Sequence, residues 1–497
     1  MDTLHLLLHG FAVALQPMNL FFALIGCVLG TLVGVLPGLG PSAATAILIP
    51  VTFVLDPTPA IIMLAAIYYG AMYGGTITSV LINVPGEAAS AVTCLDGYQM
   101  ARKGRAGAAL AVAAIGSFIG GTAAVAALVV VALPLSELAL RFGPPEFFAL
   151  MLIGLTMVTG LAGRSIIRAL MSAVVGLIVA MIGMDPVQGA PRFTFGITEM
   201  LGGLNIVPVV MGLFGISEIL LNVESPAVQI FDAKVSHLIP TREDLRRSFG
   251  AIVRGTGIGL FLGLVPGIGT MVPTFISYTV EKRVSKTPEK FGTGMIEGVA
   301  GPETANNAYA NGAMIPLFTL GIPASPTLAI LMGALMMNGL LPGPLLFNEH
   351  SDFVWAVIAS FVVGNVILLV LNLPLIPMWV AVLKVPYSIL FAIILGFAVV
   401  GAYSVDSSVF GIGIMLAFGL LGYAFKKLDI PLAPFALTLI LGPMMEKALR
   451  QSMEMSDGNL GVFITRPFAA GLLVVALIAL IVNTAPIFSR VKADTQI

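Results

Sequence analysis

A short glycine-rich phrase occurs twice in the chain and could do chemistry with its backbone. The copies are Gly34-Val35-Leu36-Pro37-Gly38-Leu39-Gly40 and Gly263-Leu264-Val265-Pro266-Gly267-Ile268-Gly269. Glycine and proline interrupt a helix, and each interruption leaves backbone N–H and C=O groups without partners. N–H groups at broken helix ends carry partial positive charge and bind anions, whereas freed carbonyls can hold Na⁺. The phrases therefore predict an anion site with a cation site beside it.

Polar side chains accompany these breaks and recur in a second pair of segments. Hydroxyls follow each Pro-Gly phrase, and an Asn-Val-Pro-Gly-Glu segment in the first half has a looser partner in the second half. Asparagine and glutamate are costly inside a membrane and usually functional there. The predicted substrate-binding residues are Pro37, Gly38, Gly40, Ser42, Thr45, Asn83, Pro266, Gly267, Gly269, Thr270, Thr274, Asn306, Asn307, Pro323 and Ser325.

A partly overlapping set is predicted to serve the coupling cation: Gly38, Gly86, Glu87, Gly267 and Glu303. Glu297 is a further candidate for carrying a proton. The alternative is that these glutamates lie at the membrane surface, or that Glu87 and Glu303 cap helix N-termini. The glycines could instead serve only close helix packing. Residues 96–98, Asp-Gly-Tyr, are expected to form a cytoplasmic turn.

The composition indicates which elements must position these residues. Hydrophobic residues make up 58% of the 497 residues and charged residues only 10%, whereas soluble domains carry about 25% charged residues. The mean hydropathy is +1.03, which predicts a polytopic α-helical membrane protein. The net charge of −1 and the two cysteines argue against nucleic-acid binding and a disulfide framework. We expect no catalytic residues, metal site, cofactor or enzymatic activity, because no Walker A phrase, nucleophile elbow or metal-ligand spacing occurs.

The segment around the second Pro-Gly phrase is predicted to be a re-entrant hairpin. Basic residues flank it on both sides, at Arg254 and at Lys282, Arg283 and Lys286. Basic residues favour the cytoplasmic face, so both flanks should lie there. The stretch from residue 254 to residue 266 makes about 18 Å of helix, too short for a hydrocarbon core of about 30 Å. Its counterpart, residues 19–56, contains no Lys or Arg and should enter from the opposite side.

The two Pro-Gly phrases, at residues 37 and 266, are separated by nearly half the chain, and other features recur at similar spacing. Paired breaks of this kind are typical of inverted-topology repeats, with the substrate site where the repeats meet. The predicted fold is all-α and polytopic, with two inverted repeats that each contain a re-entrant hairpin and broken helices. The predicted division is a first transmembrane repeat (1–221), a cytoplasmic linker (222–253), a second transmembrane repeat (254–450) and an appended C-terminal helix with a tail (451–497). Chance recurrence of Gly, Pro and Ala is the alternative.

Several phrases resemble a known family. They are Leu36-Pro37-Gly38-Leu39-Gly40-Pro41, Tyr69-Gly70-Ala71-Met72-Tyr73-Gly74-Gly75, Pro85-Gly86-Glu87, Leu95-Asp96-Gly97-Tyr98, Gly301-Pro302-Glu303-Thr304-Ala305-Asn306-Asn307-Ala308 and Gly339-Leu340-Leu341-Pro342-Gly343-Pro344-Leu345-Leu346-Phe347. Together they resemble the large membrane subunit of tripartite tricarboxylate transporters (TctA-type). The resemblance implies a multi-pass protein of the bacterial cell inner membrane that imports tricarboxylates or related organic acids by cation symport, without ATP. It also implies two partners, a small membrane subunit and a periplasmic substrate-binding protein. The coupling ion it implies is Na⁺, with H⁺ as the alternative.

Two other functions stay open. An ion channel with two re-entrant loops would show the same breaks, whereas a membrane-embedded enzyme is disfavoured because no catalytic dyad is visible. For a transporter, the polar and broken segments predict an elevator-type moving block made of residues 19–100 and 254–339. The smoother apolar segments, such as residues 106–133 and 353–371, would form the static scaffold.

Overall fold

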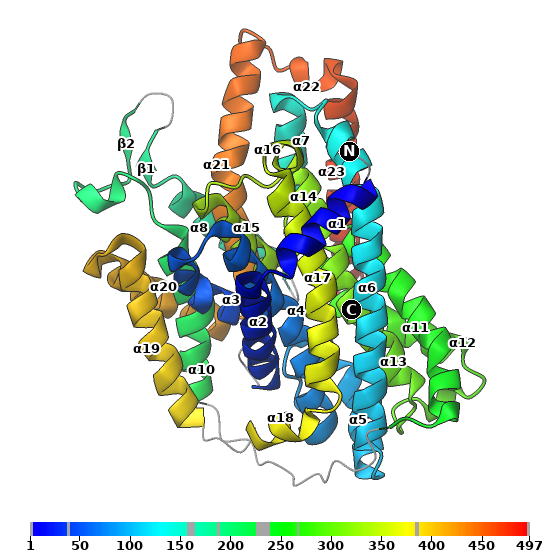
Figure 1. Cartoon of the computed structure of the whole chain (residues 1–497). Helices are drawn as coiled ribbons and strands as arrows, with labels where there is room; N and C mark the ends of the chain where they lie inside the picture. Colours follow the sequence, from blue (N-terminus) through cyan, green and yellow to red (C-terminus); the bar gives the residue numbers. More distant parts are fainter. Residues whose placement is uncertain are drawn as a thin grey trace.

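The fold is known from a computed structural model, which describes residues 3–36, 40–156, 165–185, 189–224, 239–265, 268–382 and 387–494. Seven helices in the described ranges are long and apolar enough to cross a membrane. Two two-residue strands form an antiparallel pair that projects from the helical body (Figure 1). The predicted all-α, polytopic membrane fold is therefore confirmed.

The elements of the first half are α1 (Thr3–Ala14), α2 (Pro17–Val35), α3 (Pro41–Leu48), η1 (Ile49–Val54), α4 (Pro57–Ile82), η2 (Ala88–Ala91), α5 (Thr93–Arg102), α6 (Ala106–Ala139), α7 (Pro144–Thr156), α8 (Ile166–Ala180), β1 (Gly183–Met184), β2 (Pro191–Arg192), η4 (Thr198–Met200), α9 (Ile206–Val210), the π-helical η5 (Met211–Ile216) and α10 (Ser217–Glu224). Those of the second half are α11 (Arg242–Gly263), α12 (Met271–Val284), η6 (Pro288–Lys290), α13 (Glu297–Gly312), α14 (Met314–Leu320), α15 (Pro326–Met337), α16 (Pro344–Glu349), α17 (Ser351–Asn372), α18 (Ile376–Val382), α19 (Tyr387–Asp406), α20 (Val409–Lys427), α21 (Leu432–Met455), α22 (Val462–Thr465) and α23 (Pro467–Asp494).

Helix α2 packs against α4 through a face that has no side chains. Gly26, Gly30 and Gly34 recur every fourth residue, so they share one face of α2. A Cβ atom at these positions would lie 2.5, 2.5 and 2.3 Å from the carbonyl oxygens of Met63, Ile67 and Ala71 on α4. The two backbones can approach this closely only because glycine occupies all three positions.

Helix α11 packs against α13 in the same way. Gly255, Gly259 and Gly263 of α11 correspond to the three glycines of α2, and they are separated from them by the same number of residues as the two Pro-Gly phrases are from each other. Cβ atoms at these positions would lie 2.4, 2.3 and 3.0 Å from the carbonyl oxygens of Gly301, Ala305 and Tyr309 on α13. These three residues correspond to Met63, Ile67 and Ala71 of α4, with one slightly longer separation for all three pairs. Matching contacts at constant offsets show that the two halves share a repeated structure, so the recurrence is not chance.

The repeat continues beyond the packed helices. Asn83 ends α4 and Gly321 ends α14, and both residues have left-handed backbones, with φ of 57° and 70°. Glu87 is the N-cap of η2, and Ser325 is the N-cap of α15. Both pairs keep the offset that relates α4 to α13. Each repeat therefore consists of a hairpin, a long buried segment and a capped helix start.

The long helix α6 spans most of the height of the molecule and gives a reference direction (Figure 1). Helix α11 runs parallel to it. Arg105, just before α6, pairs with Asp244 in the first turn of α11. One-third of the way along α6, a Cβ atom at Gly116 would lie 3.5 Å from Ile252 in the middle of α11.

Helix α2 runs in the opposite direction, as its contacts with α17 show. Asn365 lies beside Gly121 of α6, whereas Asn372, farther along α17, lines a cavity with residues near Ser117. Helix α17 is therefore antiparallel to α6. Cys27 of α2 donates to the carbonyl of Gly364, and Asn372 donates to Thr31 Oγ1, so α2 follows the direction of α17. Helices α2 and α11 thus run in opposite directions, as inverted repeats require.

The second hairpin begins earlier than the predicted boundary at residue 254. Helix α11 starts at Arg242, where Thr241 and Asp244 form a capping box. Ser248 and Ala251 are buried, so this part of the predicted linker packs inside the protein. The interruption itself is present, since α11 ends at Gly263 and α12 begins at Met271. The division of the chain into four segments otherwise stays a prediction.

Candidate functional site

The flanks of the two helix breaks meet at one cavity of about 470 Å³, which we call the inter-repeat cavity. Gly40 and Ser42 line it from the first break, and Ile268, Gly269 and Thr270 line it from the second. The predicted site residues Pro37, Gly38, Pro266 and Gly267 lie outside the described residues. Because one flank of the cavity comes from the segment after α2 and the other from the segment before α12, the cavity lies between the two repeats.

Three helices of eight or more residues begin at this cavity. Helix α3 starts after Gly40, α12 starts after Thr270 and α15 starts after Ser325, and all three preceding residues line the wall. Helices α3 and α15 begin with Pro41 and Pro326, which have no N–H, and the Ser325 hydroxyl accepts from the N–H of Leu328. The remaining N–H groups of the first turns have no partner within their own helices. Three such ends around one space create a region of positive potential that suits a carboxylate.

Hydroxyl groups join the two repeats within the wall. Ser42 Oγ, in the first turn of α3, lies 2.8 Å from Thr327 Oγ1, in the first turn of α15. Thr270 adds a third hydroxyl at the start of α12. A carboxylate in the cavity can therefore accept from backbone and hydroxyl donors of both repeats.

Two acidic residues also line the cavity. Glu87 is only 5% exposed, and its side chain accepts from the N–H of Ala89 at 2.8 Å and from Asn306 Nδ2 at 2.9 Å. Glu87 thus caps η2, as one reading of the sequence expected, and it also joins the two repeats. Glu218 of α10 forms an ion pair with Lys426.

Glu303 lies inside α13, not at a helix N-terminus or at the surface. It is 1% exposed, and Thr76 Oγ1 donates to its carboxylate at 2.6 Å. The hydroxyl of Thr93 donates to the other carboxylate oxygen. Both hydroxyls come from the first repeat, so Glu303 joins the repeats but does not line the inter-repeat cavity.

Several other predicted residues lie away from the cavity wall. Thr45 and Thr274 donate to carbonyls of their own helices, those of Pro41 and Met271. Asn307 donates to Ser117 Oγ at 2.7 Å. Three further predicted residues do not line the cavity. Asn83 is exposed at the end of α4, Pro323 is buried close to Gly321 in the chain, and Gly86 packs against Gly34.

Sequence reasoning missed ten of the sixteen wall residues, among them Ala88, Phe214, Glu218 and Thr327. Thr327 had a local signal, because Ser325-Pro326-Thr327 has the N-cap and N1 proline pattern of a helix start. Phe214 and Glu218 had none, since the tertiary fold alone brings η5 and α10 to the cavity.

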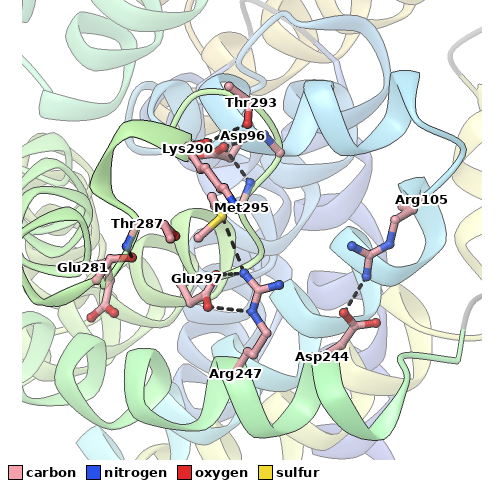
Figure 2. Close-up of polar contacts among 12 residues, drawn as sticks. Asp96, Arg105, Asp244, Arg247, Glu281, Thr287, Lys290, Thr293, Met295 and Glu297 are labelled. Carbon is pink, nitrogen blue, oxygen red and sulfur yellow. Dashed lines mark hydrogen bonds and ion pairs between the residues drawn. The ribbon is translucent and has the colours of Figure 1, made fainter.

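A second cluster of polar side chains lies at the start of α11 and the end of α12, where the hairpin is predicted to face the cytoplasm (Figure 2). Arg247 makes two hydrogen bonds of 2.8 Å to Glu297, so this predicted proton carrier is held in an ion pair. Arg254 binds both carboxylate oxygens of Glu281, at 2.8 and 2.6 Å, and so ties α11 to α12.

Asp96 is part of this cluster, and the prediction that it forms a turn is wrong. It lies in α5 and is fully buried. Figure 2 shows it beside the loop that carries Thr293 and Met295. One carboxylate oxygen accepts from the N–H groups of Gly292, Gly294 and Met295 at 2.7–2.9 Å, and the other accepts from Tyr278. Local sequence could not show this role, because the donors belong to the other repeat.

Replacing Asp96 by alanine should lower the stability of the protein by about 3 kcal/mol or more. The change leaves the N–H groups of Gly292, Gly294 and Met295 without their acceptor, at roughly 1 kcal/mol or more each. Thermal unfolding of the purified chain measures the effect. Asp352→Ala is the matched control, because Asp352 is exposed in its contact with His9 and lies in helix α17, so its replacement should cost less than about 1 kcal/mol. Equal unfolding midpoints for the two variants would contradict the assignment.

Comparison with known proteins identifies the family of the chain. Residues 20–437 match the tripartite tricarboxylate transporter TctA family. An uncharacterized 52.8 kDa protein of Agrobacterium vitis, from the TAR-I ttuC′ 3′ region, is 47% identical over 487 residues, 98% of this chain and 97% of the relative. An uncharacterized protein from the TAR-II ttuC′ 3′ region of the same organism is 45% identical over 228 residues, 46% of this chain and 94% of the relative. No solved structure matches the chain significantly. The chain belongs to the tripartite tricarboxylate transporter TctA family.

Proposed function

We propose that the chain is the large membrane subunit of a secondary transporter that imports tricarboxylates or related organic acids by cation symport. The observation that carries the proposal is the convergence of three helix N-termini and four hydroxyls, those of Ser42, Thr270, Ser325 and Thr327, on one cavity between inverted repeats. This donor set matches the carboxylate groups of the proposed substrate. Family membership supports the tripartite arrangement, with a small membrane subunit and a periplasmic binding protein in a bacterial inner membrane.

Substrate counterflow tests the proposal against the alternative of an ion channel. The three subunits are reconstituted in liposomes that contain unlabelled citrate or another organic acid, and the entry of labelled substrate is followed. A carrier that alternates between two faces exchanges external for internal substrate, so internal substrate should accelerate entry. A channel would instead equilibrate the label without acceleration, and that result would refute transport by alternating access.

The mechanism we propose is a moving block, made of residues 19–100 and 254–339, that slides against a scaffold including α6 and α17. The support is the distribution of polarity, since both hairpins and most of the inter-repeat cavity wall lie in the block. Cysteines in each hairpin are paired with cysteines at several depths of α6, in a chain lacking Cys27 and Cys94. Crosslinking at two depths, shifted by substrate and cation, is expected. Crosslinking at one depth under all conditions would favour a fixed site with local gates.

A further inference from the structure

A second, much smaller cavity of about 10 Å³ lies between α4, α6 and α17. Its polar wall consists of Tyr73 and Thr76 of α4, Ser117 of α6 and Asn372 of α17. The rest of the wall is apolar. A space of this size holds one water molecule or one small dehydrated ion. None of these four residues is among the predicted substrate-binding or cation-coupling residues.

Two oxygen atoms of this wall have no hydrogen-bond partner within the described part of the chain. They are the hydroxyl of Tyr73, a residue 2% exposed, and Oδ1 of Asn372, a residue 4% exposed. The amide nitrogen of Asn372 is engaged with Leu368 O at 3.0 Å and with Thr31 Oγ1 at 3.4 Å, so its oxygen is the free group. Buried polar atoms without partners are costly, which points to a ligand in the cavity.

The other two oxygens of the wall use their hydrogens elsewhere. Thr76 Oγ1 donates to the Glu303 carboxylate at 2.6 Å, and Ser117 Oγ donates to the backbone carbonyl of Glu303 at 3.3 Å. A hydroxyl that donates its hydrogen keeps lone pairs for another partner. Ser117 Oγ also accepts from Asn307 Nδ2 at 2.7 Å, so it keeps one lone pair. Thr76, Ser117 and Asn372 therefore each have an acceptor site left for the cavity, and the Tyr73 hydroxyl can accept as well. Such a set is matched to a hard cation.

The charge of the ligand follows from Glu303. This carboxylate is buried, its side-chain donors are hydroxyls, and no ion pair with a basic side chain is found for it in the described ranges. An ionised carboxylate buried without a counter-charge is strongly disfavoured, the more so inside a membrane, so Glu303 either takes up a proton or has a cation beside it. A monovalent cation one hydrogen bond away would balance the ionised form, whereas a divalent cation would leave an excess positive charge.

We propose that this cavity binds one dehydrated Na⁺ ion through Tyr73, Thr76, Ser117 and Asn372, with Glu303 supplying the counter-charge through Thr76. The site is separate from the inter-repeat cavity and from the helix breaks. Because its ligands belong to α4, α6 and α17, the ion would join three helices and stabilise the conformation described here. Binding stands on this geometry alone, whereas a role in driving uptake rests on the proposed function.

The test measures the thermal unfolding midpoint of the purified full chain at increasing NaCl, with choline chloride keeping ionic strength constant. We expect a saturable rise with NaCl and no such rise with KCl, since K⁺ is larger. Tyr73→Phe removes one ligand oxygen and should raise the half-saturating Na⁺ concentration at least about tenfold. Tyr69→Phe is the matched control. Tyr69 is also a residue of α4, and its hydroxyl is also buried without a hydrogen-bond partner, but this hydroxyl lies against Gly364, outside the cavity. It should respond to Na⁺ as the unaltered chain does.

Two results would overturn the proposal: no specific effect of Na⁺ on the unaltered chain, or the same Na⁺ response in Tyr73→Phe. Either would indicate that a water molecule fills the cavity. If Tyr73→Phe does not fold, Asn372→Ala provides the same comparison, because it removes a different ligand oxygen. Failure of the proposed transport function can be told apart from failure of the Na⁺ site. If only the transport function is wrong, the unaltered chain still shows the Na⁺ response in thermal unfolding but shows no counterflow of organic acids.

Discussion

Gly86→Ala should prevent the chain from accumulating as folded protein. A Cβ atom at Gly86 would lie 1.9 Å from the carbonyl oxygen of Gly34 and 2.7 Å from the Cα atom of Gly75. Both obstacles are backbone atoms of packed helices, so they cannot rotate away. Overpacking usually costs about 1–3 kcal/mol, and a clash with two backbones should cost about 4 kcal/mol or more, at the upper end for single substitutions.

The matched control is Gly40→Ala, which adds the same methyl group at the wall of the inter-repeat cavity. Gly40 has φ of −67°, which alanine adopts freely, and no heavy atom lies within 4 Å of its added Cβ. Size-exclusion profiles of tagged protein after membrane extraction measure the outcome. Gly40→Ala should elute as a single symmetric peak, whereas Gly86→Ala should be aggregated or absent. Equal recovery of the two variants would show that the Gly34–Gly86 contact is not required.

Glu303→Gln should reduce cation-driven uptake about hundredfold, equivalent to about 2.7 kcal/mol. Glutamine keeps the size of the side chain and can still bond with Thr76 and Thr93, whose hydroxyls can donate or accept. The change therefore removes chiefly the charge that we assign to balancing the cation. Uptake by reconstituted three-subunit transporter, at saturating Na⁺, is the measurement.

Two controls separate charge from packing for Glu303. The unfolding midpoint of Glu303→Gln in the absence of Na⁺ should be at or above that of the unaltered chain, because glutamine retains the fold and removes a buried charge that has no cation to balance it. Glu303→Asp keeps the charge on a shorter side chain and should recover part of the uptake. If Glu303→Gln transports within about threefold of the unaltered chain, no charge at this position drives transport, and the cation is bound elsewhere.

Local sequence patterns were sufficient for the framework of the fold. Glycines recur every fourth residue before each Pro-Gly phrase, and the offset that they share with these phrases marks the duplication. Asn83 and Gly321 also occupy matching positions in the two halves, and both residue types can adopt a left-handed backbone at a helix end. These features depend on backbone geometry within a short segment, which residue type largely determines.

Contacts between the repeats could not be predicted from local patterns. Ser42 meets Thr327, and Glu87 meets Asn306, although the members of each pair belong to different halves of the chain. The Tyr73–Asn372 cavity requires three helices to be placed together with close precision. The turn predicted at Asp96 is wrong for the same reason, because an acidic residue before a basic stretch resembles a solvated turn until its buried donors are known.

The central claim is that one carboxylate site lies where the two hairpins meet. Protection of engineered cysteines tests it most directly. Ser42→Cys and Thr270→Cys place a thiol at the start of α3 and of α12, one from each repeat, in a chain with Cys27→Ala and Cys94→Ala. Thr293→Cys, on an exposed loop away from the cavity, is the control. The rate of maleimide labelling is measured in NaCl with a panel of mono-, di- and tricarboxylates. At least one tricarboxylate or related acid is expected to slow labelling at both cavity positions by a similar factor and to leave the labelling of Thr293→Cys unchanged. Two results would contradict a shared site. In one, no acid changes the labelling rate at Ser42→Cys or Thr270→Cys; in the other, an acid protects one of these positions without the other.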